Sequence, residues 1–187
     1  MKMRNIFYLL AILLVFTACG DNQPEEIKWK SIDHDKFKIS LPEFMDEMQG
    51  LNEYAVMEYG NRDENLYLII LRDKKEVFLD LLSLEDSLIS QTDVHDYTGK
   101  IAEMMKENSG ISDFSVLDTK TKNDWSTVFA AFSDRVDGKD YYYHLGITES
   151  ADYFYQLMFF TPVTKKKEFI PVMDSSILSF QPHSRLE

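Results

Sequence analysis

Side chains with hydrogen-bonding chemistry lie close together in the run Tyr141-Tyr142-Tyr143-His144. If this run is a strand, alternation directs Tyr142 and His144 to one face and Tyr141 and Tyr143 to the other. Gln156, in the next expected strand, could add an amide group. Tyr142, His144 and Gln156 therefore form a possible ligand pocket on one sheet face. The alternative is that the tyrosines only fill a half-buried sheet and keep their hydroxyls in water.

Cys19 is the only cysteine, so the chain offers it no partner for a disulfide. Lys2 and Arg4 precede an unbroken apolar run over residues 6–16, and small residues follow. A charged start and a short apolar run are typical of a secretory signal peptide. The run is shorter than the about 20 apolar residues that a transmembrane helix needs. We therefore expect residues 1–18 to be a signal peptide.

The four residues that end in Cys19, Phe-Thr-Ala-Cys, resemble the lipobox of bacterial lipoproteins. Phe16 departs from that motif, which usually has leucine three positions before the cysteine. The resemblance implies that the thiol receives a diacylglyceryl group, that cleavage occurs just before Cys19, and that the new amino group is acylated. More than one acyl chain holds a protein stably to a bilayer. The alternative is an ordinary signal peptide with a leftover cysteine.

The lipobox resemblance also indicates where the mature chain begins and in which compartment of the cell the protein is found. Residues 19–28 are expected to form an acidic tether after the lipidated cysteine, and residues 29–182 a single domain. The protein is expected in the cell envelope, with its lipid in the membrane. Gly20 replaces the aspartate that retains enteric lipoproteins at the inner membrane. This favours the outer membrane if the cell has one.

The composition is that of an acidic globular protein. The chain has 187 residues and a formal net charge of −12, with 44% hydrophobic and 13% aromatic residues. This apolar content excludes a disordered chain. A domain of about 150 residues buries enough surface to fold without a disulfide or metal. The acidic balance lacks the basic stripe that nucleic-acid binding requires, so we expect no nucleic-acid partner.

The motifs of the common enzyme and cofactor sites are missing from the sequence. It has no Gly-x-Ser-x-Gly elbow, P-loop or dinucleotide-binding glycine pattern. The histidines also lack the spacing of a metal site. We therefore predict that the protein is not an enzyme and holds neither a cofactor nor a metal.

Two acidic groups could still do chemistry. Asp134, Asp137 and Asp140 surround a glycine turn and could collect Ca²⁺, although a solvated hairpin tip is the expected alternative. Asp93 and His95 could form a dyad, but Asp93 suits the N-cap of a helix better. We favour the structural interpretation in both cases.

Apolar periodicity predicts the elements that must position these residues. The expected strands cover residues 37–41, 54–59, 66–72, 114–121, 125–135, 139–148 and 153–161, and the expected helices cover 74–90, 93–108 and 164–178. The strand at 153–161 is apolar on both faces and must be covered on both. These patterns predict an α+β fold. Its mostly antiparallel sheet of about six strands would have helices on both faces, as an α/β/α sandwich.

The run from Phe37 to Pro42, the hairpin around Tyr59 and Tyr67, and a last helix that ends at Phe180 resemble the PsbP-like superfamily. Members of this superfamily are mostly non-enzymatic accessory or binding proteins without a common active site. The resemblance implies a membrane-anchored accessory or protein-binding module with a protein partner in the envelope. The alternative is a small-ligand carrier or sensor with a pocket between sheet and helices. A hydrolytic enzyme with an unrecognised site is the least favoured function.

Overall fold

The computed structural model describes residues 27–85, 92–109, 111, 113–122 and 125–183. The expected signal peptide, Cys19 and most of the acidic tether lie outside these ranges. Within them, none of the helices has both the length and the apolar character needed to cross a membrane. Every strand and helix expected from the sequence falls at least partly within the described residues.

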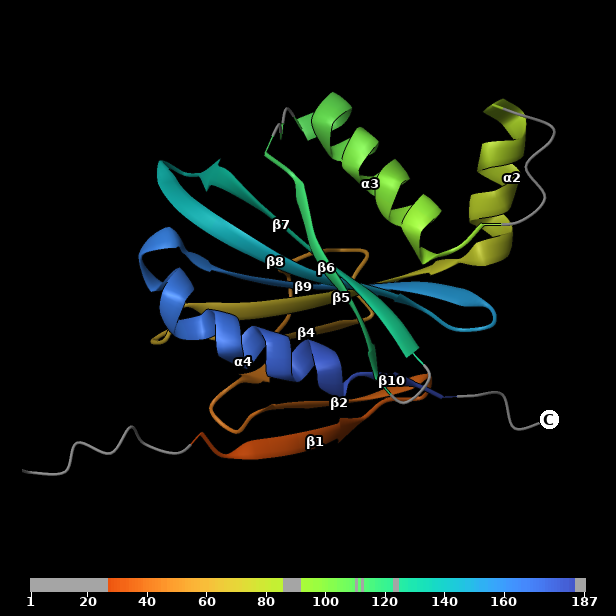
Figure 1. Cartoon of the computed structure of the whole chain (residues 1–187). Helices are drawn as coiled ribbons and strands as arrows, with labels where there is room; N and C mark the ends of the chain where they lie inside the picture. Colours follow the sequence, from red (N-terminus) through yellow and green to blue (C-terminus); the bar gives the residue numbers. More distant parts are fainter. Residues whose placement is uncertain (1–26, 86–91, 110, 112, 123–124, 184–187) are drawn as a thin grey trace, which may run out of the picture.

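The centre of the protein is a seven-stranded sheet in which every neighbouring pair is antiparallel. The strand order is β3-β4-β5-β9-β8-β7-β6 (Figure 1). The predicted α+β fold with a mostly antiparallel sheet is therefore confirmed. The strands are β3 (Asp46–Glu47), β4 (Met57–Asn61), β5 (Leu66–Lys74), β6 (Ser115–Lys122), β7 (Trp125–Val136), β8 (Lys139–Glu149) and β9 (Tyr153–Pro162).

A smaller sheet of three strands, in the order β1-β2-β10, accompanies the main sheet. Its strands are β1 (Trp29–Asp33), β2 (Phe37–Pro42) and β10 (Gln181–Pro182). The sequence predicts β2 but not β1, because β1 is exposed or half-buried along its length and lacks a strong apolar alternation. Pro182 pairs with Phe37, so the last strand closes the domain against its beginning.

Three α-helices and one 3₁₀ turn complete the described fold: α2 (Lys75–Glu85), α3 (Val94–Ser109), η1 (Val163–Lys165) and α4 (Lys166–Ser179). The sequence predicts that the first helix continues to residue 90, but residues 86–91 lie outside the described ranges. Pro171 lies inside α4 at an exposed position. The last helix therefore accommodates this proline, and its α-helical part begins after a 3₁₀ turn.

Two hydrophobic clusters use the two faces of the main sheet. In the first, side chains of β9 such as Leu157 and Phe159 pack with α4 and β2. In the second, Phe154 and Met158 of the same strand pack with Phe78 of α2 and with α3. Figure 1 shows α2 and α3 together above the sheet, and α4 on its other side next to β2. This arrangement explains why β9 is apolar on both faces.

Candidate functional site

The strand register separates the three residues expected to line one pocket. His144 of β8 pairs with Phe159 of β9, whereas Gln156 pairs with Ile147. Paired residues in an antiparallel sheet point to the same face, so Tyr142 and His144 lie on the α4 face. Gln156 lies on the opposite face, with α2 and α3. The prediction of one shared pocket is therefore wrong for Gln156.

The sequence contained a signal for this separation. The turn expected between the two strands covers residues 149–152, an even number. A symmetric turn of even length pairs even-numbered residues of β8 with odd-numbered residues of β9, and this is the observed parity. Two even-numbered residues, such as 144 and 156, must then face opposite sides.

Tyr142 and His144 do interact, in a buried cluster between β8 and α4. His144 is only 3% exposed, and its Nδ1 lies 3.1 Å from the Tyr142 hydroxyl. Its Nε2 lies 2.7 Å from Oδ1 of Asp174 on α4. Because both ring nitrogens are engaged within the fold, this cluster ties a helix to the sheet. The alternative in which the tyrosines keep their hydroxyls in water does not describe Tyr142, because this residue is buried and its hydroxyl lies against His144.

One carboxylate and two lysines lie near the His144 imidazole. Lys120 of β6 lies 3.5 Å from the Asp174 carboxylate, and Lys166 of α4 lies 4.0 Å above the Tyr142 ring. Burial lowers the pKa of His144, and the two lysines lower it further, while the hydrogen bond and charge of Asp174 act in the opposite direction. The imidazole is therefore kept neutral to a lower pH than a histidine in water.

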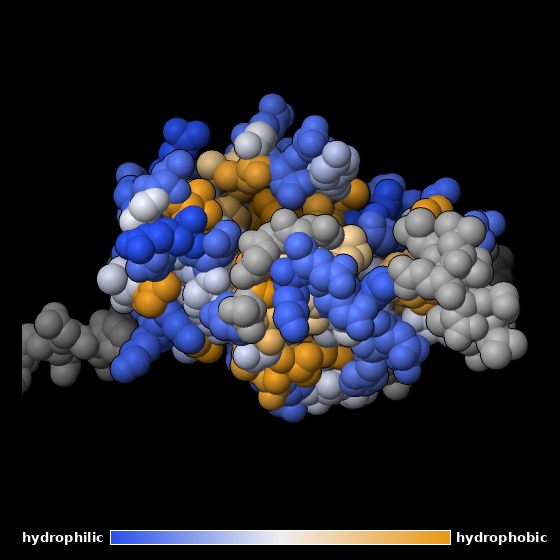
Figure 2. Space-filling model, turned by 90° about the horizontal axis from the view of Figure 1, so that it is seen from above, coloured by the Kyte–Doolittle hydropathy of each residue, from blue (hydrophilic) through white to orange (hydrophobic). Residues whose placement is uncertain are grey.

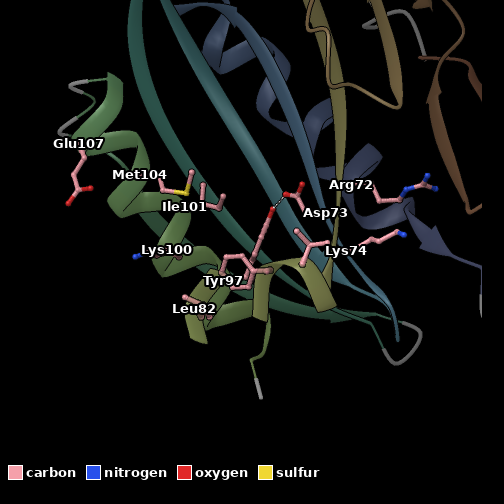
Figure 3. Close-up of a pocket in the computed structure, with 11 residues that line it drawn as sticks. Arg72, Asp73, Lys74, Leu82, Tyr97, Lys100, Ile101, Met104 and Glu107 are labelled. Carbon is pink, nitrogen blue, oxygen red and sulfur yellow. Dashed lines mark hydrogen bonds between the residues drawn. The ribbon is translucent and has the colours of Figure 1, made fainter. Parts of the chain in front are cut away.

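A cavity of about 600 Å³ lies on the other side of the sheet, between β5, α2 and α3. Its walls are mainly apolar, and Figure 3 shows Ile101 and Met104 of α3 near Tyr97. This volume is in the range of sites for small molecules. The lining side chains are Arg72, Asp73, Lys74, Val77, Phe78, Leu82, Tyr97, Lys100, Ile101, Met104 and Glu107.

A polar network that joins the exposed Asp73 to the buried Tyr97 and Gln156 borders this cavity. The Tyr97 hydroxyl donates a hydrogen bond to Oδ2 of Asp73 (Figure 3). The Gln156 amide nitrogen donates to the Tyr97 oxygen at 2.7 Å and to the same Asp73 oxygen at 3.4 Å. Burial, reinforced by the charge of Asp73, raises the pKa of Tyr97 far above its ordinary value. Gln156 thus belongs to the cavity side, with partners other than those expected.

Aromatic packing holds Tyr97 in place. Its ring stacks on Phe154 of β9 at a centroid distance of 4.2 Å, and Phe78 of α2 meets the Tyr97 ring edge-on at 4.9 Å. Such pairs add to the free energy of burial. In the sequence, Tyr97 belongs to the apolar stripe of its helix, which gives no signal of its polar role. Asp73 was missed because it follows the apolar run of β5, and nothing local connects it with α3.

The surface on the cavity side is mixed in polarity. Figure 2, which looks down on α2 and α3, shows apolar patches between hydrophilic side chains. At the cavity, Val77 of α2 is 53% exposed and Met104 of α3 is 47% exposed. The cavity edge therefore presents apolar side chains to solvent.

The two acidic candidates have structural roles in the fold. Asp93 accepts hydrogen bonds from the backbone N–H groups of His95 and Asp96 at 2.8 and 3.0 Å, so it caps α3 as favoured. These bonds lower the pKa of Asp93. Asp137 occupies the left-handed turn between β7 and β8, and Asp140 pairs with Arg135 at 3.3 Å. No potential metal-binding group of three or more ligands occurs among the described residues.

The sequence matches no family model and no curated protein. Solved structures do match. Cyanobacterial PsbP (CyanoP) from Synechocystis has a TM-score of 0.54 at 12% identity, over 90% of this chain and 99% of its own. LpqN, involved in cell envelope biogenesis of Mycobacterium tuberculosis, has a TM-score of 0.51 at 10% identity, over 84% and 91%. A Mog1 mutant has a TM-score of 0.56 at 10% identity, over 85% and 98%.

A structure from Bacteroides thetaiotaomicron also matches, with a TM-score of 0.47 and 17% identity. The match covers 81% of this chain but 46% of that one, so this chain spans about half of its length. The likeness to CyanoP and Mog1 shows that this chain has the PsbP-like fold, as the sequence resemblance predicted.

Proposed function

We propose that the chain is a cell-envelope lipoprotein held to the membrane by lipid on Cys19. Its PsbP-like domain would be a non-enzymatic accessory module that binds another envelope protein. The order of charged start, apolar run and cysteine supports the anchor. The fold that the domain shares with LpqN, a protein of cell envelope biogenesis, is compatible with a role in the envelope. An outer-membrane destination applies if the cell has two membranes.

The observation that carries the binding role is the open apolar cavity between α2 and α3. Val77 and Met104 are about half exposed at its edge, on two different helices. A partner that inserts an apolar side chain between them would remove this surface from water. Methionine also adapts its shape to a partner at little cost. We therefore place the partner surface on the α2–α3 side.

The anchor is tested by metabolic labelling with palmitate in the native host. We expect label in the wild-type chain and none in Cys19→Ala, because Cys19 is the only cysteine. Label that persists in the Cys19→Ala chain, or an unlabelled wild-type chain, would contradict the anchor.

The partner is tested by crosslinking in intact cells, followed by purification in detergent. We expect one dominant envelope protein with the wild-type chain, and its loss from a Val77→Glu/Met104→Glu variant. The matched control is Val116→Glu/Leu117→Glu on the edge strand β6, whose side chains are 58% and 53% exposed. Equal losses from both variants would refute the α2–α3 surface, and no partner for the wild type would refute the accessory role.

The second candidate function is that of a small-ligand carrier or sensor, and the same cavity favours it. A concave, mainly apolar site with a few polar groups is the usual form of a small-molecule site. Asp73 and Tyr97, which line the cavity, supply such polar groups, and Gln156 donates hydrogen bonds to both. The site differs from the pocket expected around Tyr142 and His144.

A further inference from the structure

We propose that the α2–α3 cavity binds a cationic amphiphile, with its ammonium head against Asp73 and its alkyl chain along α3. This inference rests on the second candidate function, that of a small-ligand carrier or sensor. It assigns the chemical class of the ligand from the polar groups and charges around the cavity.

The polar wall offers an acceptor to a ligand. The proton of the Tyr97 hydroxyl is donated to Asp73, and the Tyr97 oxygen already accepts from Gln156. The bonds that Asp73 accepts from Tyr97 and Gln156 both end on its Oδ2. The Asp73 residue is exposed at the cavity, so its Oδ1 can accept a bond from a ligand. A carboxylate oxygen only accepts, so the matching ligand group is a donor.

The charged side chains that line the cavity are the cationic Arg72, Lys74 and Lys100 and the anionic Asp73 and Glu107, and the directions of their charged ends favour a cationic donor at Asp73. Arg72 stacks its guanidinium on the Tyr153 ring at 4.9 Å. Figure 3 shows the charged ends of Arg72 and Lys74 directed away from Tyr97. On α3, Lys100 lies 3.5 Å from Glu103. The negative charge of Asp73 therefore stays effective at the cavity wall, in a chain whose net charge is −12.

The rest of the cavity suits an unbranched apolar chain. Figure 3 places Ile101 and Met104 between Asp73 and Glu107, so the apolar side chains of α3 continue away from the carboxylate. Val77 and Leu82 of α2 also line the cavity. An alkyl chain that starts at Asp73 would thus be covered along both helices, and each methylene removed from water would strengthen binding.

Three probes with the same chain and different heads test the ligand class: octylammonium, octanol and octanoate. The full chain with Cys19→Ser is titrated at neutral pH and followed by the backbone amide signals in NMR spectra. We expect octylammonium to bind about tenfold more tightly than octanoate, with octanol between them. The largest shifts are expected at Val77, Ile101 and Met104.

A charge-neutral variant isolates the contribution of Asp73. Asp73→Asn keeps an acceptor for Tyr97 and removes the charge, so we expect the preference for ammonium over carboxylate to fall severalfold. Asp63→Asn makes the same charge change in the exposed turn before β5, at the opposite end of that strand, and should preserve the preference.

The outcomes separate the inference from the function on which it rests. If none of the three probes binds, both the small-ligand function and the inference are overturned. If the probes bind in the cavity with equal affinity, or octanoate binds best, the cationic class is wrong and the small-ligand function stands. Shifts confined to residues outside β5, α2 and α3 would overturn the site.

Discussion

Tyr97 and His144 show how differently two buried polar residues of this sheet are used. Each is almost fully buried, and each joins a helix to the sheet through hydrogen bonds. His144 has both ring nitrogens engaged with Tyr142 and Asp174. Tyr97 forms part of a cavity wall, next to a carboxylate that is exposed. At the residue scale, the cavity side therefore has polar capacity left for a ligand.

Replacement of Tyr97 by phenylalanine tests the polar network on the cavity side. Tyr97→Phe removes the hydroxyl that links Asp73 and Gln156, and leaves the Gln156 amide with its 3.4 Å contact to Asp73. We expect the free energy of unfolding to fall by about 1–2 kcal/mol in urea denaturation. Tyr54→Phe, at a side chain that is 77% exposed, is the control and should change little. Equal stabilities of both variants would contradict a structural role for the network.

The His144 cluster predicts a pH dependence of stability. Because burial lowers the pKa of His144 in the folded protein, the unfolded chain takes up a proton first as the pH falls. The stabilising effect is therefore fully present above the ordinary histidine pKa of 6.5 and is lost as the pH falls below it. We expect the wild type to lose more stability than His144→Gln between about pH 7.5 and about pH 5. Parallel urea midpoints across this interval would contradict the prediction.

At the scale of elements, the close contact between α4 and β8 depends on a glycine. A Cβ atom added at Gly146 would overlap Cγ2 of Ile177 and lie 3.2 Å from its Cβ. Ile177 is β-branched and 1% exposed, so it has little freedom to move away. Gly146 therefore sets how closely the last helix approaches the sheet, next to the His144 cluster.

Two glycine-to-alanine substitutions should have opposite effects on stability. Gly146→Ala forces α4 away from β8, and we expect a loss of about 1–3 kcal/mol in the free energy of unfolding. Gly99→Ala, inside α3 where an added Cβ meets nothing within 4 Å, should stabilise the protein by about 0.5–1 kcal/mol. Thermal or urea denaturation distinguishes the two, and a stabilising Gly146→Ala would refute the close packing of α4.

At the scale of the whole molecule, one sheet separates two hydrophobic clusters. The first contains β2 and α4, and the second contains α2 and α3. The cavity belongs to the second side, and the buried His144–Asp174 pair belongs to the first. Substitutions that abolish the binding of a ligand or partner on the α2–α3 side therefore leave the hydrophobic cluster under α4 buried.

This division predicts that small core deletions on opposite faces have additive effects. Ile39 of β2 lies in the first cluster and Ile147 of β8 in the second, and both are fully buried. We expect Ile39→Val and Ile147→Val each to cost about 0.5–1.5 kcal/mol. The double variant should cost their sum to within about 0.5 kcal/mol. A coupling of more than about 1 kcal/mol in the double-mutant cycle would contradict two independent clusters.

The sequence by itself determined the features that depend on neighbouring residues. The Asp137-Gly138 turn, the cap at Asp93 and the apolar alternation of the long strands are local, because each follows from one segment's backbone and side chains. The opposite orientation of His144 and Gln156 also follows from a local feature, the even length of the turn expected between β8 and β9. The edge strands β1 and β10 were not determined in this way, since β1 is exposed or half-buried and β10 has only two residues.

The tertiary structure alone decided which distant residues meet. Asp174 reaches His144 from a helix 30 residues later in the chain, and Tyr97 reaches Asp73 across 24 residues. Neither contact follows from local periodicity, because it depends on how α3 and α4 pack on a sheet assembled from both halves of the chain. The cavity likewise forms only where α2, α3 and β5 come together. Local sequence therefore determines the long strands and the helices of this protein, while packing between distant elements creates its candidate site.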